Sequence, residues 1–447
     1  GGVGGIVFTF VIRSARKEPA LFYSHEELSR ASHRTVYDRL SALELDWEAL
    51  SAPLAKAFCQ EKNGRPVDPV IYYKAFLVAY FEGIAADVEL ADRLADSLSI
   101  RRFLFGSVAG DPPDHSSLSR VKKRLDMWGD LDGLLEPAVA LLSRAGLVGG
   151  DAVAVDTTLI PSRARRRPPR EGEGGEEETP RALYDPEAKV AAKPNYPARP
   201  SYKVAATVDG AHRVVVAADA YLASSGEGAC ARMAVAETVR SLGRCPSYVV
   251  ADKGMDDAAF LAHVEFFGGI PVVPFQKSGG TKSSGLGKER FFYDAARDLY
   301  LCPAGEELAR ASGGVAERVE YRAKEAVCAQ CPIRILCQGE RKSVKSVSRH
   351  FQEGSRDRAR RSRRDPRRRK LLGYRKAVAE PVFADFKESG GLSKIWTKGL
   401  PKARAKAKMA AIGWNLKVLM KAVEKGKAVL PPKESPKGPK GGFQIRF

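Results

Sequence analysis

The chain has 447 residues, 44% of them apolar, and a formal net charge of +20. This length and composition allow two or three domains with sizeable cores and exclude a chain that is disordered throughout. Lys74 interrupts the most apolar run, 70–81, so no segment approaches the roughly 18 apolar residues that cross a bilayer, and we expect no membrane partner. Seven cysteines, four of them clustered, argue against a secreted disulfide framework and favour a reducing cytoplasm.

The positive charge is concentrated in the last quarter of the chain. From Arg341 onward there are 31 Lys or Arg residues against 8 Asp or Glu, whereas the preceding part has a net charge of −3. Ten of the basic residues fall within 356–370, which is more than one solvated helix face explains. A cluster of this size predicts a surface that binds a polyanion with a steep salt dependence. Four arginines of this tract are the expected DNA contacts: Arg363, Arg364, Arg367 and Arg368.

Residues 21–148 have helical periodicity and predict an all-helical domain. Asp68 followed by Pro69 is the pattern of an N-cap and a first-turn proline. The stretch 70–81 behind it is apolar on nearly all sides and ends at Gly83, so we expect a buried helix there.

Two more helices are expected in this domain. The first presents three leucines on one side: Leu90, Leu94 and Leu98. The second follows the turn 110–113, is capped by Asp114 or Ser117, and presents three basic side chains outward: Arg120, Lys123 and Arg124. A short basic helix after a tight turn is typical of DNA contact, but a solvated surface produces the same pattern, and both interpretations stay open.

From Gly150 the periodicity changes to that of strands. The expected strands are 152–159, 202–208, 213–218, 248–251 and 270–275, with helices at 228–242 and 257–267. This order predicts a mixed α/β sheet. Asp156 lies within the first strand, and Asp252 directly follows the fourth, at the carboxyl end where ligands of open α/β sheets collect.

A third acidic residue, Glu380, begins a helical segment behind the arginine tract. Two helical turns separate it from Lys387, so the pair shares one face, while three apolar residues occupy the opposite face: Val378, Val382 and Phe386. Carboxylates from distant parts of a chain are what a two-metal phosphoryl-transfer site requires, and Asp156, Asp252 and Glu380 are therefore candidate ligands of two Mg²⁺ or Mn²⁺ ions. The competing interpretation is that each aspartate forms a turn or caps a helix.

Four cysteines form a second candidate metal site: Cys302, Cys328, Cys331 and Cys337. Four thiolates suit one structural Zn²⁺ that would stabilise a segment with little core of its own, and the alternative is a set of reduced, unliganded thiols. A distant third interpretation of the chain is a zinc nucleobase deaminase, because His263 and Glu265 followed by Cys328 and Cys331 imitate its His-x-Glu and Pro-Cys-x-x-Cys motifs. Val327 stands where that motif has proline.

The motifs together resemble a known family. The residues that carry the resemblance lie between Tyr23 and Met420: Pro113-Asp114-His115-Ser116-Ser117, Val155-Asp156-Thr157-Thr158, Ala251-Asp252-Lys253-Gly254, Cys302-Pro303-Ala304-Gly305, Cys328-Ala329-Gln330-Cys331-Pro332 with Cys337, and Glu380-Pro381-Val382-Phe383 with Lys387. The chain resembles bacterial insertion-sequence transposases of the DDE type, in the four/five-like superfamily and its branch with a cysteine-bearing insertion in the catalytic domain.

The resemblance implies a transposase that binds the ends of an insertion sequence and performs metal-dependent DNA strand cleavage and strand transfer. Asp156, Asp252 and Glu380 would hold two divalent ions, and Lys387 would lie near the DNA backbone. Lys376 stands where the family has an arginine one turn before the third acid, with Arg375 adjacent, and both are expected to contact DNA. The partners implied are double-stranded DNA, as terminal inverted repeats and target, and a second copy of the chain in a homodimer. The expected location is the cytoplasm at the nucleoid. The alternative is a catalytically inactive DNA-binding protein of the same fold.

The implied fold is an RNase H-like mixed-sheet core with an inserted cysteine-containing segment, preceded by an all-helical N-terminal domain. The predicted organisation is as follows: 1–20, an unassigned extension; 21–148, a helical DNA-binding domain; 149–280, the first part of the catalytic core; 281–372, an insertion with the cysteines and the basic tract; 373–428, the C-terminal helices of the core; and 429–447, a disordered basic tail.

Overall fold

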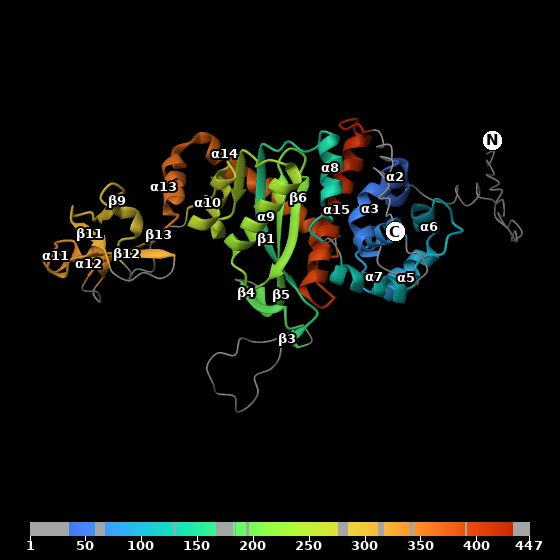
Figure 1. Ribbon diagram of the computed structural model, residues 1–447, viewed down its shortest axis with the longest axis horizontal. Coiled ribbons are helices and arrows are strands. Elements are labelled where there is room, and N and C mark those ends of the chain that lie inside the picture. Colours follow the sequence, from blue (N-terminus) through green and yellow to red (C-terminus); the bar gives the residue numbers. More distant parts are fainter. Residues whose placement is uncertain are drawn as a thin grey trace, which may run out of the picture.

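The structure is a computed structural model that describes residues 35–58, 68–128, 131–166, 182–183, 185–193, 196–275, 285–311, 317–339, 344–388 and 391–431. Helices from the N-terminal part of the chain gather at one end of an elongated molecule, a large sheet occupies the middle, and a small sheet lies at the other end (Figure 1). None of the helices in these ranges is long and apolar enough to cross a membrane. The predicted extension 1–20 and most of the predicted tail 429–447 lie outside the described residues.

The N-terminal part is helical, as the sequence predicts. Its helices are α2 (Val36–Ala42), α3 (Trp47–Phe58), α4 (Pro69–Phe81), α5 (Asp87–Asp96), α6 (Leu98–Phe105), α7 (His115–Trp128) and α8 (Glu136–Arg144). Asp68 caps α4 by accepting a 2.8 Å hydrogen bond from Val70 N, and the helix is buried along most of its length. Asp114, rather than Ser117, caps α7, because its carboxylate accepts a 2.6 Å hydrogen bond from Ser117 N.

One prediction in this part is wrong. Leu98 does not extend the leucine face of α5, because Ser97 ends that helix and caps the next one by accepting a hydrogen bond from Ile100 N. Leu98 therefore begins α6 and is 40% exposed, whereas Leu90 and Leu94 are buried. A serine that competes for backbone hydrogen bonds ended a helix that periodicity alone would have continued.

The large sheet is mixed, as predicted. Its strands are β1 (Ala152–Pro161), β4 (Lys189–Lys193), β5 (Tyr196–Asp209), β6 (Val215–Leu222), β7 (Tyr248–Ala251) and β8 (Ile270–Val272), and a short pair, β2 (Arg165–Arg166) and β3 (Ala182–Leu183), lies beside it. β5 pairs antiparallel with β1, β4 and β6, whereas β7 pairs parallel with both β1 and β8. The two parallel pairings bring the carboxyl ends of β1 and β7 toward the same edge.

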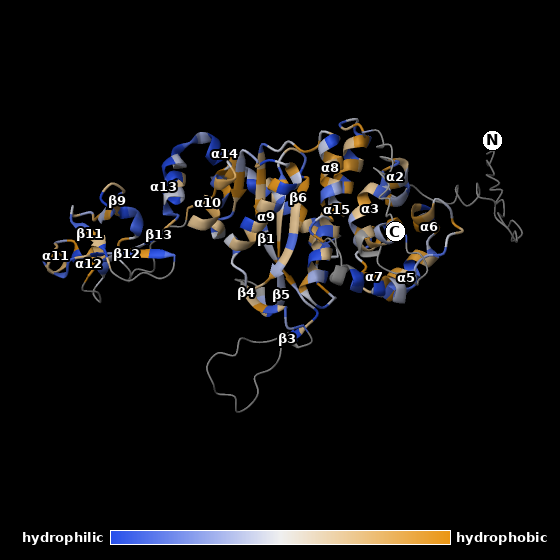
Figure 2. Cartoon of the chain, in the orientation of Figure 1, coloured by the Kyte–Doolittle hydropathy of each residue, from blue (hydrophilic) through white to orange (hydrophobic). Residues whose placement is uncertain are grey.

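Helices cover this sheet and hold it to the N-terminal helices. They are α9 (Glu227–Leu242), α10 (Ala258–Phe266), α14 (Pro366–Glu388) and α15 (Leu400–Glu424), and a further helix, α13 (Glu353–Arg361), packs against α10. Apolar colour is concentrated where these helices meet the strands, while α13 is almost entirely polar (Figure 2). Asn415 on α15 mimics a strand neighbour: its side-chain oxygen accepts from Val215 N and its side-chain nitrogen donates to Val215 O, both at 2.8 Å.

The small sheet was not predicted. It runs in the order β13 (Ser346–His350), β12 (Arg318–Ala323), β11 (Glu307–Arg310), β10 (Leu299–Leu301), β9 (Phe292–Asp294), with two short helices, α11 (Glu325–Ala329) and α12 (Arg334–Gln338). It has its own core, which includes Tyr300, Leu308, Tyr321 and Val347. Most of these strands are only three to five residues long and carry charged residues on their exposed face. The alternation of apolar and polar residues along such a strand is too short to predict it from the sequence.

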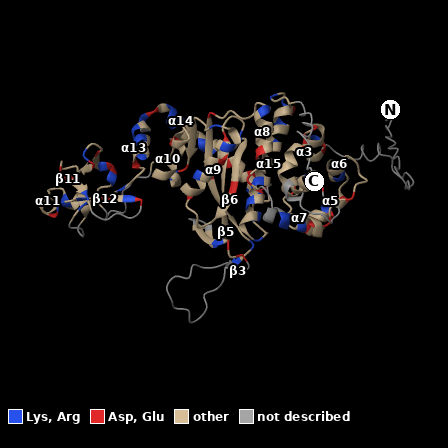
Figure 3. Cartoon of the chain, viewed as in Figure 1, with Lys and Arg blue, Asp and Glu red and all other residues tan. Residues whose placement is uncertain are grey.

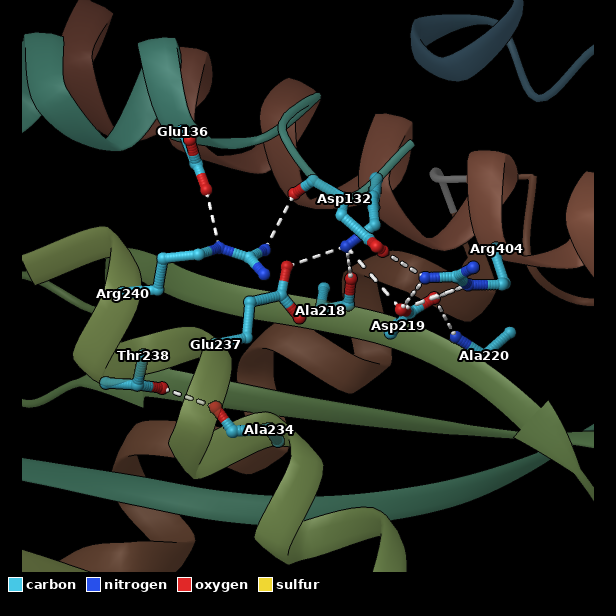
Figure 4. A network of polar contacts seen from close by, with 11 residues as sticks. Asp132, Glu136, Ala218, Asp219, Ala220, Ala234, Glu237, Thr238, Arg240 and Arg404 are labelled. Carbon is cyan, nitrogen blue, oxygen red and sulfur yellow. Dashed lines mark hydrogen bonds and ion pairs between the residues drawn. The ribbon is translucent and has the colours of Figure 1, made fainter. Parts of the chain in front are cut away.

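Buried ion pairs connect α15 to the rest of the core (Figure 4). Lys408 is fully buried and its Nζ lies 2.6 Å from Glu237 Oε1 on α9 and 3.7 Å from Asp219 Oδ2 on β6. Arg404 donates to both carboxylate oxygens of Asp219 and also pairs with Asp132, which precedes α8. The network therefore ties the N-terminal helices, the sheet and the last helix into one unit.

Removing Lys408 should reveal the cost of these buried charges. Burial raises the pKa of Glu237, and the charge and hydrogen bond of Lys408 lower it, so Lys408→Met should raise it further above its unfolded value of 4.5. The folded variant then retains a proton that the unfolded chain releases, so its stability should be greatest below pH 4.5 and fall as pH rises through the folded pKa. We expect a loss of about 3–5 kcal/mol at pH 8 and a smaller loss at pH 5, measured by urea unfolding.

Lys421→Met is the matched control for this experiment, because Lys421 lies on the exposed side of the same helix. It should change the free energy of unfolding by no more than about 0.5 kcal/mol at either pH. A Lys408→Met loss that is equal at pH 5 and pH 8 would show that Glu237 does not titrate in this window.

Candidate active site

Asp156 and Asp252 lie at the same level on adjacent parallel strands. The register of β1 and β7 pairs Val155 with Ala251, so each aspartate is the residue that directly follows this pair. Asp156 continues in β1 opposite Ala206 of β5, whereas Asp252 leaves β7 and starts a short 3-10 helix, Lys253–Met255. The sheet topology alone therefore brings together two acids that are far apart in the sequence.

Arg375 lies between these two carboxylates. Its Nη1 donates a 2.8 Å hydrogen bond to Asp156 Oδ2, and its Nη2 lies 3.5 Å from Asp252 Oδ1. The Arg375 side chain is only 13% exposed, Asp156 is 20% exposed and Asp252 is 50% exposed. Thr157 N donates a 2.8 Å hydrogen bond to the other Asp156 oxygen. One guanidinium thus compensates two like charges that the strands force close together.

A side chain and a hydrogen bond lie beside the elements that carry the acids and the arginine. A Cβ atom on Gly254 would fall 2.0 Å from Glu227 Oε2, the flexible end of a side chain at the start of α9. Tyr374, the neighbour of Arg375, donates a hydrogen bond to Gly210 O at the turn between β5 and β6. This hydrogen bond restricts the part of α14 that carries the arginine.

Glu380 and Lys387 share the exposed face of α14, and the opposite face is buried through Val378, Val382 and Phe386, as predicted. Glu380 follows Arg375 by five residues, which is about 7.5 Å of helix rise. α14 packs against β1, β5, β7 and β8. Within the described part of the chain, however, no three His, Cys, Asp or Glu side chains form a group that could hold a metal ion. The structure thus brings together two of the three predicted ligands and places the third on the adjoining helix.

The basic tract divides into exposed and buried residues. Arg364 and Arg367 are exposed, and Arg367 stacks on the Tyr248 ring with its guanidinium 5.3 Å from the centroid. Figure 3 shows the Lys and Arg colour along the ribbon of α13 and the start of α14. The side chain of Arg363 lies outside the described residues. Lys376 is exposed, whereas Arg375 is engaged by the two aspartates.

The prediction that Arg368 contacts DNA needs correction. Arg368 is 4% exposed, and its guanidinium donates to the carbonyls of Pro271 and Val273 at the end of β8 and to Ser362 Oγ. Burial lowers the pKa of this arginine. In this structure Arg368 closes the end of the sheet. A cluster of charges in a sequence does not show which of its arginines are buried in this way and which lie on the surface.

On α7 the predicted outward side chains are accessible: Arg120 and Lys123 are exposed, Arg124 is half-buried, and Leu118 and Val121 face the core. A solvated face and a DNA-binding face remain equally compatible with this arrangement. The prediction of DNA contact here stays a prediction.

The four cysteines lie in and beside the small sheet. Cys328 and Cys337 are buried in its core, and Cys302 packs against it. Burial raises the pKa of the Cys337 thiol, Lys345 lowers it, and the nearby thiols of Cys302, Cys328 and Cys331 raise it again. The thiols are near enough to influence one another's charge, although among the described residues they do not form a ready group of metal ligands. The zinc site stays a prediction.

The deaminase interpretation finds no support in the placement of its residues. His263 Nε2 lies 3.0 Å from Arg232 O, and Glu265 pairs with Arg358. Both groups are engaged on α10, beside the large sheet, whereas Cys328 and Cys331 belong to the small sheet. A zinc deaminase requires these groups around one ion.

Two family models match the chain. The model described as a transposase DDE domain matches residues 301–420, and the model described as a transposase domain (DUF772) matches residues 25–124. The chain belongs to the DDE transposases of insertion sequences. The first match includes Glu380 and Lys387 and begins after Asp156 and Asp252. No curated protein matches the chain.

Two solved structures show a weaker likeness. One is a piggyBac transposase synaptic complex with hairpin DNA, at 12% identity and a TM-score of 0.39, with 89% of this chain and 78% of that chain covered. The other is the Mos1 mariner paired end complex with Mn, at 14% identity and a TM-score of 0.16, with 47% of this chain and 61% of that chain covered. Likenesses of this size do not define a fold, and the family assignment rests on the family models.

Replacing Arg375 by alanine should destabilise this transposase, because Asp156 and Asp252 would then face each other without a cation. We expect the free energy of unfolding to fall by about 1–3 kcal/mol, less than for a fully buried pair since Asp252 is half exposed. Lys376→Ala is the matched control on the same helix, and it should change stability by less than about 0.5 kcal/mol. Chemical denaturation without divalent metal provides the measurement, and equal stability of the two variants would contradict the role given to Arg375.

Proposed function

We propose that this chain is an active transposase that binds double-stranded DNA at the ends of an insertion sequence, cuts a strand there and joins the freed end to target DNA. The observation that carries the proposal is the convergence of Asp156 and Asp252 at the guanidinium of Arg375, with Glu380 on the same helix as that arginine. The alternative, an inactive DNA-binding protein of the same fold, is less favoured because all three acids are present.

The catalytic core in this proposal is RNase H-like. Its support is the strand order β6-β5-β1-β7-β8, in which an antiparallel run is followed by two parallel strands. The third strand of this order, β1, carries Asp156, and the fourth, β7, ends directly before Asp252. The small sheet with its cysteines would be an insertion between β8 and α14.

The proposed metal ligands are Asp156, Asp252 and Glu380. Carboxylate oxygens suit Mg²⁺ or Mn²⁺, and the first two fit this purpose because a cation, Arg375, already lies against both. When bound, two such ions stabilise the attacking and leaving oxygens of an in-line displacement at phosphorus. Glu380 would act from the exposed face of α14, where Lys387 would position the DNA backbone by its positive charge.

Replacing the acids tests the catalytic part of the proposal. Asp156→Asn and Glu380→Gln should each lower cleavage of DNA that carries the element's terminal inverted repeats by roughly 10²- to 10³-fold with Mg²⁺ or Mn²⁺, because a metal ion supplies several kcal/mol of transition-state stabilisation. Glu388→Gln is the control, since Glu388 is an exposed acid on the same helix. It should leave the rate nearly unchanged.

Two outcomes would count against this assignment. Cleavage that survives both acid substitutions would remove Asp156 and Glu380 from catalysis. An intact protein that binds the correct ends but never cuts them would favour the inactive DNA-binding alternative.

The exposed arginines at the start of α14 are the proposed DNA surface. Changing Arg364, Arg367 and Arg369 to serine should weaken duplex binding and lower the slope of log K against log salt by up to about 3, since each lost phosphate contact contributes about 0.9. Fluorescence anisotropy at several salt concentrations measures the slope. An unchanged slope would exclude this surface.

A matched control removes the same charge from the small sheet. Arg297, Arg310 and Arg322 are exposed and paired with Glu307, Asp298 and Glu320. Their replacement by serine should alter the slope much less.

We also propose a structural zinc held by Cys302, Cys328, Cys331 and Cys337 and a homodimer that pairs two element ends. Thiolates are the usual ligands of structural zinc. Metal analysis of the purified protein should find about one zinc ion per chain, and sedimentation with paired ends should find two chains. Metal-free folded protein would rule out the first, and one chain per DNA end pair would rule out the second.

A further inference from the structure

A basic pocket that contains an exposed tryptophan lies at the carboxyl end of β1. Its volume is about 500 Å³, and it is lined by Ser162, Arg163, Ala164, Arg165, Asp185, Trp396, Thr397 and Lys398. This size is within the range of pockets that bind small ligands. Neither the acids nor the arginine tract described above contributes to it.

Trp396 is the exposed aromatic residue of this pocket. Its side chain is 44% exposed, which is unusual for a large aromatic residue. The Arg163 guanidinium lies 5.6 Å from its ring centroid, and Lys394 Nζ lies 4.7 Å from it. Two cations therefore lie over an exposed aromatic ring, and cations together with aromatic rings are the groups with which proteins bind single-stranded nucleic acid.

The backbone around Trp396 is fixed to β1. Ile395 N donates to Pro161 O, and Arg163 N donates to Ile395 O, both at 2.8 Å, so the segment forms a bridge with the end of the strand. Ile395 itself is fully buried. Trp396 is therefore attached to a rigid strand end. Because its backbone is already ordered, little conformational entropy of this segment is lost when a ligand binds.

The charge of the pocket is positive despite Asp185. The carboxylate of Asp185 is 2% exposed and accepts hydrogen bonds from the Tyr202 hydroxyl, Ser162 Oγ and Gly399 N. Its charge is thus directed into the protein, while Arg163 and Arg165 are exposed. The Thr397 hydroxyl, which also lines the pocket, is buried and has no hydrogen-bond partner in the described part of the chain. An unsatisfied buried hydroxyl is costly to the fold.

We propose that this pocket binds an unpaired nucleotide of the DNA substrate, with its base stacked on Trp396 and its phosphate contacted by Arg163 and Arg165. The inference rests on the proposed action on DNA. Five residues of β1 separate Asp156 from Pro161, which is about 17 Å of strand. At 3.4 Å per step along a B-form strand, the stacked base lies about five nucleotides from the phosphate at Asp156.

The experiment compares DNA ends that differ only in whether they have unpaired nucleotides. A duplex with a five-nucleotide single-stranded overhang carries the fluorescent base 2-aminopurine at each overhang position in turn, and a blunt duplex of the same sequence serves for comparison. No Mg²⁺ or Mn²⁺ is added, so that no cleavage occurs. The wild-type protein should bind the overhang DNA more tightly and quench 2-aminopurine at one position much more than at the others.

Trp396→Ala should abolish that position-specific quenching and weaken overhang binding roughly five- to hundredfold, which is the effect of losing one base–aromatic stack. Binding of the blunt duplex should stay within about twofold. Trp396→Phe should restore part of the quenching. Phe266→Ala is the matched control, because Phe266 is an aromatic side chain on α10 that is 81% exposed, and it should behave as wild type.

Three outcomes overturn the inference. The first is a wild-type protein that shows no preference for the overhang DNA, and the second is a Trp396→Ala variant with unchanged quenching. The third is a Trp396→Ala variant that has normal circular dichroism and a normal thermal midpoint but loses affinity equally for blunt and overhang DNA. The cleavage test of the acids is independent of these results. If cleavage fails while stacking depends on Trp396, the pocket stands without the proposed catalysis. If cleavage succeeds while stacking is absent, only the pocket is wrong.

Discussion

The in-register parallel pairing of β1 and β7 is the constraint on which the site depends. Because Val155 lies opposite Ala251, Asp156 and Asp252 follow at the same level. Two carboxylates this close raise each other's free energy unless a cation lies between them, and Arg375 supplies that cation from α14. The helix that carries Glu380 is therefore held to the sheet by the acids themselves as well as by its apolar face. The contacts of the proposed catalytic acids therefore also stabilise the fold.

The excess charge of the last quarter has two separate uses. Four cations point into the protein, where they bind strand-end carbonyls or carboxylates: Arg368, Arg375, Arg404 and Lys408. Their partners lie in the preceding part of the chain, which is slightly acidic. The C-terminal helices thus close onto an earlier sheet by charge complementarity, and only the remaining cations, such as Arg364 and Arg367, are exposed for a polyanion. Net charge by sequence segment therefore overstates the surface available to DNA.

Local signals predicted the elements that rely on local chemistry. Asp68 and Pro69 specify the start of α4, and apolar runs bounded by Gly and Asp specify β1 and β7, so these elements, and the pair of acids that they carry, could be found from the sequence. Arg375 could not be assigned in this way, because its partner Asp156 is 219 residues distant and its neighbour Lys376 has the same charge. The small sheet was missed because its strands are short. The predicted boundary at residue 372 falls within α14, a continuous helix, since a run of arginines marks charge but no end of helix.

Trp396 illustrates a further kind of signal that a sequence hides. In the chain it is an isolated aromatic residue between Lys394 and Lys398, and only the bridge to the end of β1 brings Arg163 to its ring. The same strand carries Asp156, so β1 acts as a rigid spacer between a candidate cleavage site and a candidate base-binding site. The part of β1 between these two sites is paired with β5 along its whole length, so its length changes very little. A DNA end held at both points would therefore be cut at a fixed distance from its stacked base, which gives positional accuracy without reading the sequence at the cleavage site.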